Sequence, residues 1–337
     1  MKPCLFISLT LVLLLSRGAP GQTTPQESEM DHAVRDAASS PSLYGNDVAA
    51  RGKLMHRIDL YEDALRKAKE THASDTEVGK IYLEIGLLSE EAQLWERAET
   101  NLESARSVLA HAPESSDYLA MTLSVLGNLH VQMQKFRQSE KEDEEALRLR
   151  ENLQNPLLIA RSRNDLAILY LAEHKYAKAK GFAQQAMAEF VVNPKTTIYD
   201  RISVRYALGL ALCMSKDCVS AIVPLKDAVY EAKTSLQRND ASTGFGDFIL
   251  GYAFWKSGNL TEADGYMKEG TAILNGQLGM GSQSGLAASR QYAKFLRETR
   301  RVDEAEVVER RIRQAEAVVD VHSIQAYQGG SELAGLR

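Results

Sequence analysis

The side chains that could perform chemistry are scattered along the chain and form no recognisable catalytic pattern. The seven histidines include no HExxH motif and no comparable paired spacing that would hold zinc. The chain also lacks a GxSxG nucleophile motif and a GxxxxGK[ST] phosphate-binding loop. No strand is predicted before the glycine-rich stretch at 275–285, so we interpret it as a loop between helices. The sequence therefore predicts no catalysis, no cofactor and no metal site.

Cys213 and Cys218 are the two cysteines that could form a disulfide. They lie five residues apart, across a predicted junction between a helix and a turn. A regular helix would splay the two side chains, whereas a tightened turn could bring them together. Two separately buried thiols remain the alternative. The pair cannot complete a four-ligand metal site, because no further Cys or His lies nearby.

The segment Asn164–Met187 predicts two amphipathic helices joined by a tight polar turn. A hairpin of this kind cannot bury its apolar face alone, and the sequence repeats it six times at intervals of 40 to 42 residues. Each unit has a small residue in the middle of its first helix: Gly86, Gly127, Ala167, Gly209, Gly251 and Ala293. A second small residue follows twelve positions later: Ala98, Ser139, Ala179, Ala221, Ala263 and Ala305.

These units resemble the tetratricopeptide repeat (TPR), most clearly in IGLLSEEAQLWERAETNLESA at 85–105, LALCMSKDCVSAIVPLKDA at 210–228 and LGYAFWKSGNLTEADGYM at 250–267. The period of about 42 residues is similar to the longer-helix variety of kinesin light chains. The resemblance implies an all-α fold, a right-handed superhelical solenoid of antiparallel helix pairs. Asp143 and Glu309 depart from the pattern, because they stand where a bulky apolar residue is usual. We expect the charged helix around Asp143 to pack loosely or to face solvent.

The helical pattern sets the predicted domain boundaries. We place the solenoid at 48–318, with an N-terminal capping helix at 48–71 and six repeats at about 76–316. A C-terminal tail occupies 319–337, beginning with VDVHSI, whose alternation predicts a short extended segment at 319–324.

The N-terminus predicts export. A lysine precedes an apolar run from Leu5 to Leu15, and small residues follow, which is typical of a signal peptide at 1–21. The run is too short to span a bilayer, although an uncleaved anchor remains the alternative. Residues 22–47 are rich in Ser, Thr, Pro and acidic residues and predict a flexible tether. We therefore expect a periplasmic or secreted protein with no membrane span in the mature chain.

In TPR superhelices the first helix of each unit lines an inner groove, so the resemblance implies groove-facing residues one turn either side of the small residue. These candidate partner-binding residues are Asn128, Arg161, Asn164, Tyr206, Phe248, Tyr252, Trp255, Arg290, Lys294 and Arg297. An aromatic wall with a cationic rim would suit an extended peptide or a partner helix with apolar anchors and acidic ends. The alternatives are that the aromatic residues pack between helices and that the basic residues at 290–297 form a solvated face.

Composition and motifs together favour a non-catalytic exported scaffold that binds a protein or peptide segment in its groove. The net charge of −5 and the absence of a polybasic run argue against a nucleic-acid partner. One alternative is a structural envelope component that self-associates through the ends of the solenoid. The other is an enzyme or small-ligand receptor built on the same helices.

Overall fold

The computed structural model describes residues 48–236 and 239–333, and these contain thirteen α-helices, one short 3-10 helix and no strand. The all-α solenoid predicted from the sequence is confirmed. One helix, α3 (Val48–Glu70), precedes six antiparallel helix pairs. The pairs are α4 (Asp75–Glu91) with α5 (Trp95–Leu109), α6 (Ser116–Gln132) with α7 (Phe136–Asn152), α8 (Pro156–Ala172) with α9 (Tyr176–Val192), α10 (Ile198–Met214) with α11 (Cys218–Ser235), α12 (Ala241–Lys256) with α13 (Leu260–Leu278), and α14 (Gln283–Glu298) with α15 (Val302–Leu333).

Local sequence defines where the helices begin. The hydroxyl of Ser74 accepts a hydrogen bond from the backbone of Glu77 at the start of α4. Thr197 and Asp200 form a reciprocal capping box at the start of α10. These contacts satisfy amide groups that have no partner within the helix, which is why such residues favour helix starts.

The turn inside each pair repeats the same backbone conformation. Seven positions after the small residue, every unit has a residue with positive φ: Gln93, Gln134, His174, Lys216, Gly258 and Arg300. This left-handed residue ends the first helix and reverses the chain. The repeat therefore extends from the sequence pattern to the backbone itself.

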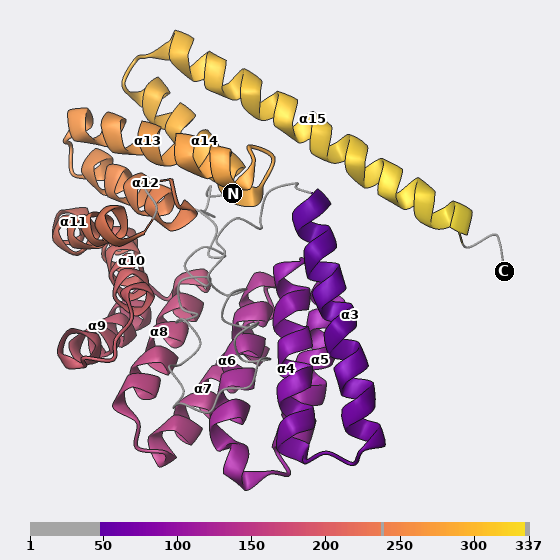
Figure 1. Ribbon diagram of the computed structural model, residues 1–337. Helices are drawn as coiled ribbons and strands as arrows, with labels where there is room; N and C mark the ends of the chain where they lie inside the picture. The colour runs from indigo at the N-terminus through magenta and orange to yellow at the C-terminus, as the bar shows by residue number, and fades with distance from the viewer. Residues whose placement is uncertain (1–47, 237–238, 334–337) are drawn as a thin grey trace.

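The pairs stack side by side in a curved array (Figure 1), with the first helices in an inner row and the second helices in an outer row. The middle of each inner helix from α6 to α12 is buried around almost its whole circumference, whereas the outer helices are buried on one face. The small residues explain how the two rows approach. A Cβ atom added to Gly86 would lie 2.6 Å from Leu102, and one added to Gly209 would lie 2.4 Å from Leu225.

The final helix differs from its prediction. Helix α15 continues without a break to Leu333, and Figure 1 shows it extending well beyond α14. The extended segment predicted at 319–324 is therefore wrong. Its alternating residues include no proline or glycine that would end a helix, so the pattern was compatible with continued helix.

The predicted signal peptide and tether, at 1–47, lie outside the described residues, so export remains a prediction. Within the described part of the chain, no helix has the length and apolar character needed to cross a bilayer.

Candidate partner-binding surfaces

Several of the predicted groove residues lie where one inner helix contacts the next. Tyr206 is fully buried, and its hydroxyl donates to the carbonyl oxygen of Ser242 on α12 at 3.1 Å. Its ring meets Phe245 edge to face at 5.5 Å. Burial is the main reason that the pKa of Tyr206 is raised. This residue joins two units and has no surface to offer a partner.

The same holds for most of the predicted aromatic wall. Phe248 is fully buried on α12, and Trp255 is 7% exposed and packs edge to face against Phe295 of α14 at 5.6 Å. The predicted accessible wall is therefore wrong for Tyr206, Phe248 and Trp255. The next inner helix packs against Tyr206 and Trp255, and Phe248 is fully buried within the stack. Tyr252 differs from them, since it is only partly buried.

The predicted polar residues of the third unit are also engaged between units. The guanidinium of Arg161 donates two hydrogen bonds to the carboxylate of Asp200 on α10, at 2.9 and 3.0 Å. Asn164 donates to the hydroxyl of Ser203 at 2.9 Å. Both are contacts between α8 and α10, and Asn164 is buried. Asn128 of the second unit is buried as well, at 4% exposure. Arg161 and Asn164 therefore connect neighbouring units, and Asn128 is buried.

The basic residues of the sixth unit are the predicted site residues that stay accessible. Arg290, Lys294 and Arg297 are all exposed on α14. Arg290 pairs with Glu316, and Arg297 makes two hydrogen bonds to Glu309 at 2.6 and 2.7 Å. Lys294 lies 3.9 Å from Glu298. Because these ion pairs are exposed to solvent, the attraction between each cation and its carboxylate is weak.

A cleft of about 340 Å³ opens between α14 and α15, which we call the end cleft. It is lined by Arg290, Ala293, Lys294, Arg297, Glu298, Glu309, Ile312 and Arg313. Four cations and two carboxylates surround a small apolar floor, so the cleft is cationic overall. Arg313 belongs to α15, and no repeat pattern could have found it, because its place depends on how α15 crosses α14.

The end cleft adjoins an aromatic corner at the end of α12. The ammonium group of Lys256 lies 3.2 Å from the ring centroid of Trp255 and 5.5 Å from that of Tyr252. Burial lowers the pKa of Lys256, and the charge of Lys294 lowers it further, while Glu298 opposes both. The charges of Lys256 on α12 and of Lys294 and Glu298 on α14 therefore act on one another. We use the name C-terminal inner surface for the accessible residues of these two helices: Tyr252, Lys256, Arg290, Lys294 and Arg297.

The charged outer helix α7 is packed into the body, contrary to the expectation that it is loose or solvated. His130 of α6 is 1% exposed. Its Nδ1 lies 2.7 Å from Glu142 of α7, and its Nε2 lies 3.0 Å from Glu99 of α5, which also accepts from Lys135 at 2.6 Å. Burial lowers the pKa of His130, but the two carboxylates outweigh it and raise the pKa above the ordinary value.

Asp143 lies close to this network and is fully buried. It stands where other units place a large apolar residue, and a Cβ atom added to Gly127 would lie 2.3 Å from its carboxylate. Burial, and next the charge of Asp165, raise the pKa of Asp143 well above its usual range. Arg150 donates to Ser162 at 2.7 Å beside them. In the sequence, the only indication of this cluster is that polar residues occupy positions where other units have apolar ones.

This buried cluster does not have the arrangement of a catalytic site. Both ring nitrogens of His130 are already engaged by carboxylates, and a general acid or base needs a free position toward its substrate. Among the described residues, no group of three or more His, Cys, Asp and Glu side chains is arranged to hold a metal ion.

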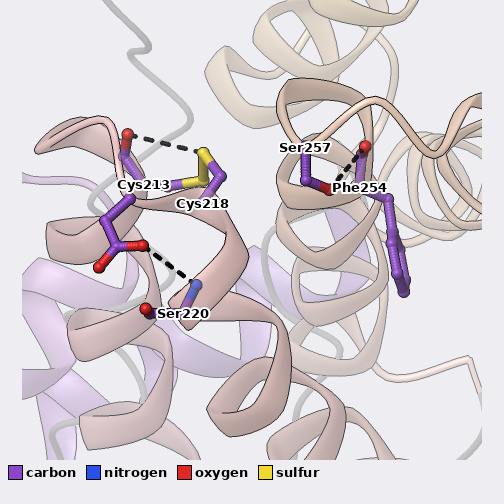
Figure 2. The surroundings of a disulfide bond; sticks show 6 residues. Cys213, Cys218, Ser220, Phe254 and Ser257 are labelled. Atoms are coloured by element: carbon purple, nitrogen blue, oxygen red, sulfur yellow. Dashed lines mark hydrogen bonds between the residues drawn. A yellow bond between two sulfur atoms is a disulfide. The ribbon is translucent and has the colours of Figure 1, made fainter.

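Cys213 and Cys218 form a disulfide, with an S–S distance of 1.97 Å (Figure 2). Cys213 belongs to the last turn of α10 and Cys218 begins α11. The positive φ of Lys216 reverses the chain between them, which brings their Cα atoms to 4.0 Å. Of the two possibilities that the sequence leaves open, the structure contains the bonded one.

Comparison with known proteins agrees with this architecture. Residues 118–188 match the family model described as tetratricopeptide repeat. The apo form of RapI matches with a TM-score of 0.65 and 14% identity, over 80% of this chain and 94% of that chain. A Rap protein complexed with Competence and Sporulation Factor matches with a TM-score of 0.57 and 15% identity, over 79% and 77%.

A third solved structure, aspartyl phosphate phosphatase F from Bacillus subtilis, has a TM-score of 0.60 and 11% identity, over 78% of this chain and 68% of that chain. No curated protein sequence matches. At these identities the structures show the fold alone. The fold and its surfaces define a helical repeat protein of the solenoid class. More particularly, residues 118–188 match the tetratricopeptide repeat, and the fold as a whole is similar to that of RapI.

Proposed function

We propose that this chain is an exported, non-catalytic TPR scaffold that binds a protein or peptide segment. The observation that carries the proposal is the C-terminal inner surface, where Tyr252 and Lys256 adjoin the exposed cations of α14. Aromatic and arginine side chains are enriched where proteins recognise one another. The Rap protein whose structure includes Competence and Sporulation Factor gives a precedent for ligand binding on a similar fold.

Export is supported from two directions. The apolar run at 5–15 with small residues after it is typical of a cleaved signal peptide. The Cys213–Cys218 disulfide is chemistry that persists in oxidising compartments outside the cytosol. N-terminal sequencing of the protein recovered from the periplasm or medium tests this proposal. We expect the mature chain to begin near Gln22, and recovery of the protein solely in the cytosol with Met1 retained would reject export.

The absence of catalysis is proposed from the titratable groups of the described residues. His130 and Asp143 are both buried, and both ring nitrogens of His130 are held by carboxylates, so neither side chain is open to a substrate. The accessible cations of α14 face carboxylates and have no nucleophile beside them in the end cleft. This surface can recognise a negatively charged group but has no residue to attack it.

Partner binding is tested with the mature chain as bait. Partners crosslinked in the envelope fraction are identified and purified, and binding to the bait is then measured in isolation. We expect Tyr252→Ala with Lys256→Gln to weaken the affinity by at least tenfold, because the aromatic and cationic contacts are removed together. Lys141→Gln with Arg148→Gln, on the exposed face of α7, is the matched control. A partner that binds both double variants as tightly as the unaltered chain would refute the assigned surface.

A further inference from the structure

We propose that the end cleft is the docking site for an acidic amphipathic helix of a partner protein, which packs on α14 as a seventh inner helix would. This inference rests on the proposed partner-binding function and names the kind of element bound. It concerns the surface of α14 and α15, which lies beyond the aromatic corner of Tyr252 and Lys256.

Two positions of the repeat contact the inner helix of the next unit. Three residues before the small residue, Asn164 and Tyr206 each contact the following inner helix, through Ser203 and Ser242. Four residues after it, Trp255 contacts Phe295 of the following inner helix. These two positions therefore form the face on which the next unit stacks.

In the sixth unit, Arg290 and Arg297 occupy the same two positions, and Lys294 lies between them. They are exposed because no further inner helix follows α14 within the described residues. This face can still pack against a helix, because α14 has about the same length as the five earlier inner helices and the same position in its repeat. What changes is its chemistry, from apolar and polar contacts to cations.

The lining of the cleft defines the complementary helix. Ala293 and Ile312 form an apolar floor, so the docked face needs small or aliphatic residues at helical spacing. Arg290, Lys294, Arg297 and Arg313 surround that floor, so carboxylates must flank the apolar stripe. The cations already pair with carboxylates of this chain, but solvated ion pairs of this kind contribute little to stability. Carboxylates of the docked helix can therefore replace them.

Two synthetic peptides of 17 residues, the length of α6, α8 and α10, test the proposal. They share a stripe of Ala and Leu at helical spacing, and four flanking positions are Glu in one peptide and Lys in the other. Binding to the full mature chain is measured by fluorescence anisotropy at low and moderate salt. We expect the acidic peptide to bind at least tenfold more tightly than the basic peptide and to weaken as salt rises.

Lys294→Gln with Arg313→Gln should weaken the acidic peptide by about tenfold, whereas Lys141→Gln with Arg148→Gln should not. Circular dichroism confirms that each variant is folded. Absence of binding by the acidic peptide, equal binding of both peptides, or an unchanged affinity of the Lys294/Arg313 variant would each overturn the proposal. A chain that dimerises by light scattering, and stops doing so in that variant, would assign the cleft to a second copy and also overturn it.

The two proposals fail in different ways. If the acidic peptide does not bind while the purified partner still depends on Tyr252 and Lys256, the helix-docking inference is wrong and the scaffold function stands. If no crosslinked partner binds the unaltered chain, the scaffold function itself fails.

Discussion

Gly251 has no space for a side chain, because the two helices of its unit touch there. A Cβ atom at this position would lie 2.6 Å from the backbone nitrogen of Met267, which cannot move without shifting α13. Gly251→Ala should therefore lower the free energy of unfolding by about 1–3 kcal/mol. Gly181, on the exposed side of α9, has nothing within 4 Å of an added Cβ. Gly181→Ala should instead raise the free energy by about 0.5–1 kcal/mol, because alanine is the better helix former.

Urea unfolding of the two variants checks this pair of expectations. Because both changes add one methyl group to a helical glycine, they differ only in the room around it. Equal midpoints for the two variants would show that the close approach at Gly251 does not constrain the unit.

The network around His130 predicts a pH-dependent stability. The pKa of His130 is raised above its value in the unfolded chain, so its contribution is fully present below about pH 6.5 and is lost as the pH rises through the folded-state value. The pKa of Glu99 is lowered, chiefly by Lys135, so its contribution is present above its unfolded value of 4.5 and is lost as the pH falls. Both contributions therefore coexist between about pH 4.5 and 6.5.

Thermal unfolding of the unaltered chain and of His130→Gln at pH 5.5 and pH 8 checks this prediction. Glutamine fills similar space but cannot be protonated, so the destabilisation by His130→Gln should be larger at pH 5.5 than at pH 8. An identical destabilisation at both pH values would mean that His130 stays neutral beside Glu142 and Glu99.

At single residues, the sequence predicted close helix contacts correctly but predicted exposure poorly. The small residues Gly86 and Gly209 predicted close helix contacts, and the structure confirms them. The prediction failed where it equated a position within the repeat with exposure. Tyr206 and Phe248 have the predicted register, but whether they face solvent depends on the distance between units, which no local pattern encodes. Arg290 has the same register but is exposed, since no further inner helix follows α14 within the described residues.

At the scale of the elements, the junction of α10 and α11 carries a covalent link that the other units lack in the described chain. A bond that closes a loop of this size stabilises the fold by about 2 kcal/mol in the chain-entropy treatment. Cys213→Ser with Cys218→Ser should therefore lower the free energy of unfolding by up to that amount. Urea unfolding with and without reductant measures it, and the double variant should no longer respond to reductant. A variant as stable as the oxidised chain would show that helix packing alone holds this turn.

The helices themselves were largely predictable, whereas their turns and ends were not. Helical periodicity and the small residues indicated all six helix pairs, and five of the pairs lie wholly within the predicted solenoid at 48–318. The positive φ of the turn residues could not be predicted from the sequence, because five of the six are Gln, His, Lys or Arg instead of glycine. The last helix exceeded its prediction because nothing in 319–324 stops a helix once it has begun.

At the scale of the whole molecule, each unit of the stack covers one face of the unit before it. On the forward face of α12, Trp255 packs against Phe295 of α14, and the partly buried Tyr252 lies beside Trp255. A chain shortened to end at Gly281 loses that cover and exposes an aromatic face in place of the cations of α14. We expect this truncated chain to bind a hydrophobic dye and to self-associate, because large exposed apolar patches favour association.

Light scattering of the truncated chain gives its mass as concentration rises. The matched control carries Tyr252→Lys and Trp255→Arg in the same truncated chain, which reproduces the residue types of Lys294 and Arg297 at the equivalent places on α14. This control should remain monomeric, because a solvated cationic face takes over the role of a terminal unit. If the truncated chain without these changes stays monomeric, the charges on α14 are not needed to end the stack. Their presence would then point to binding alone.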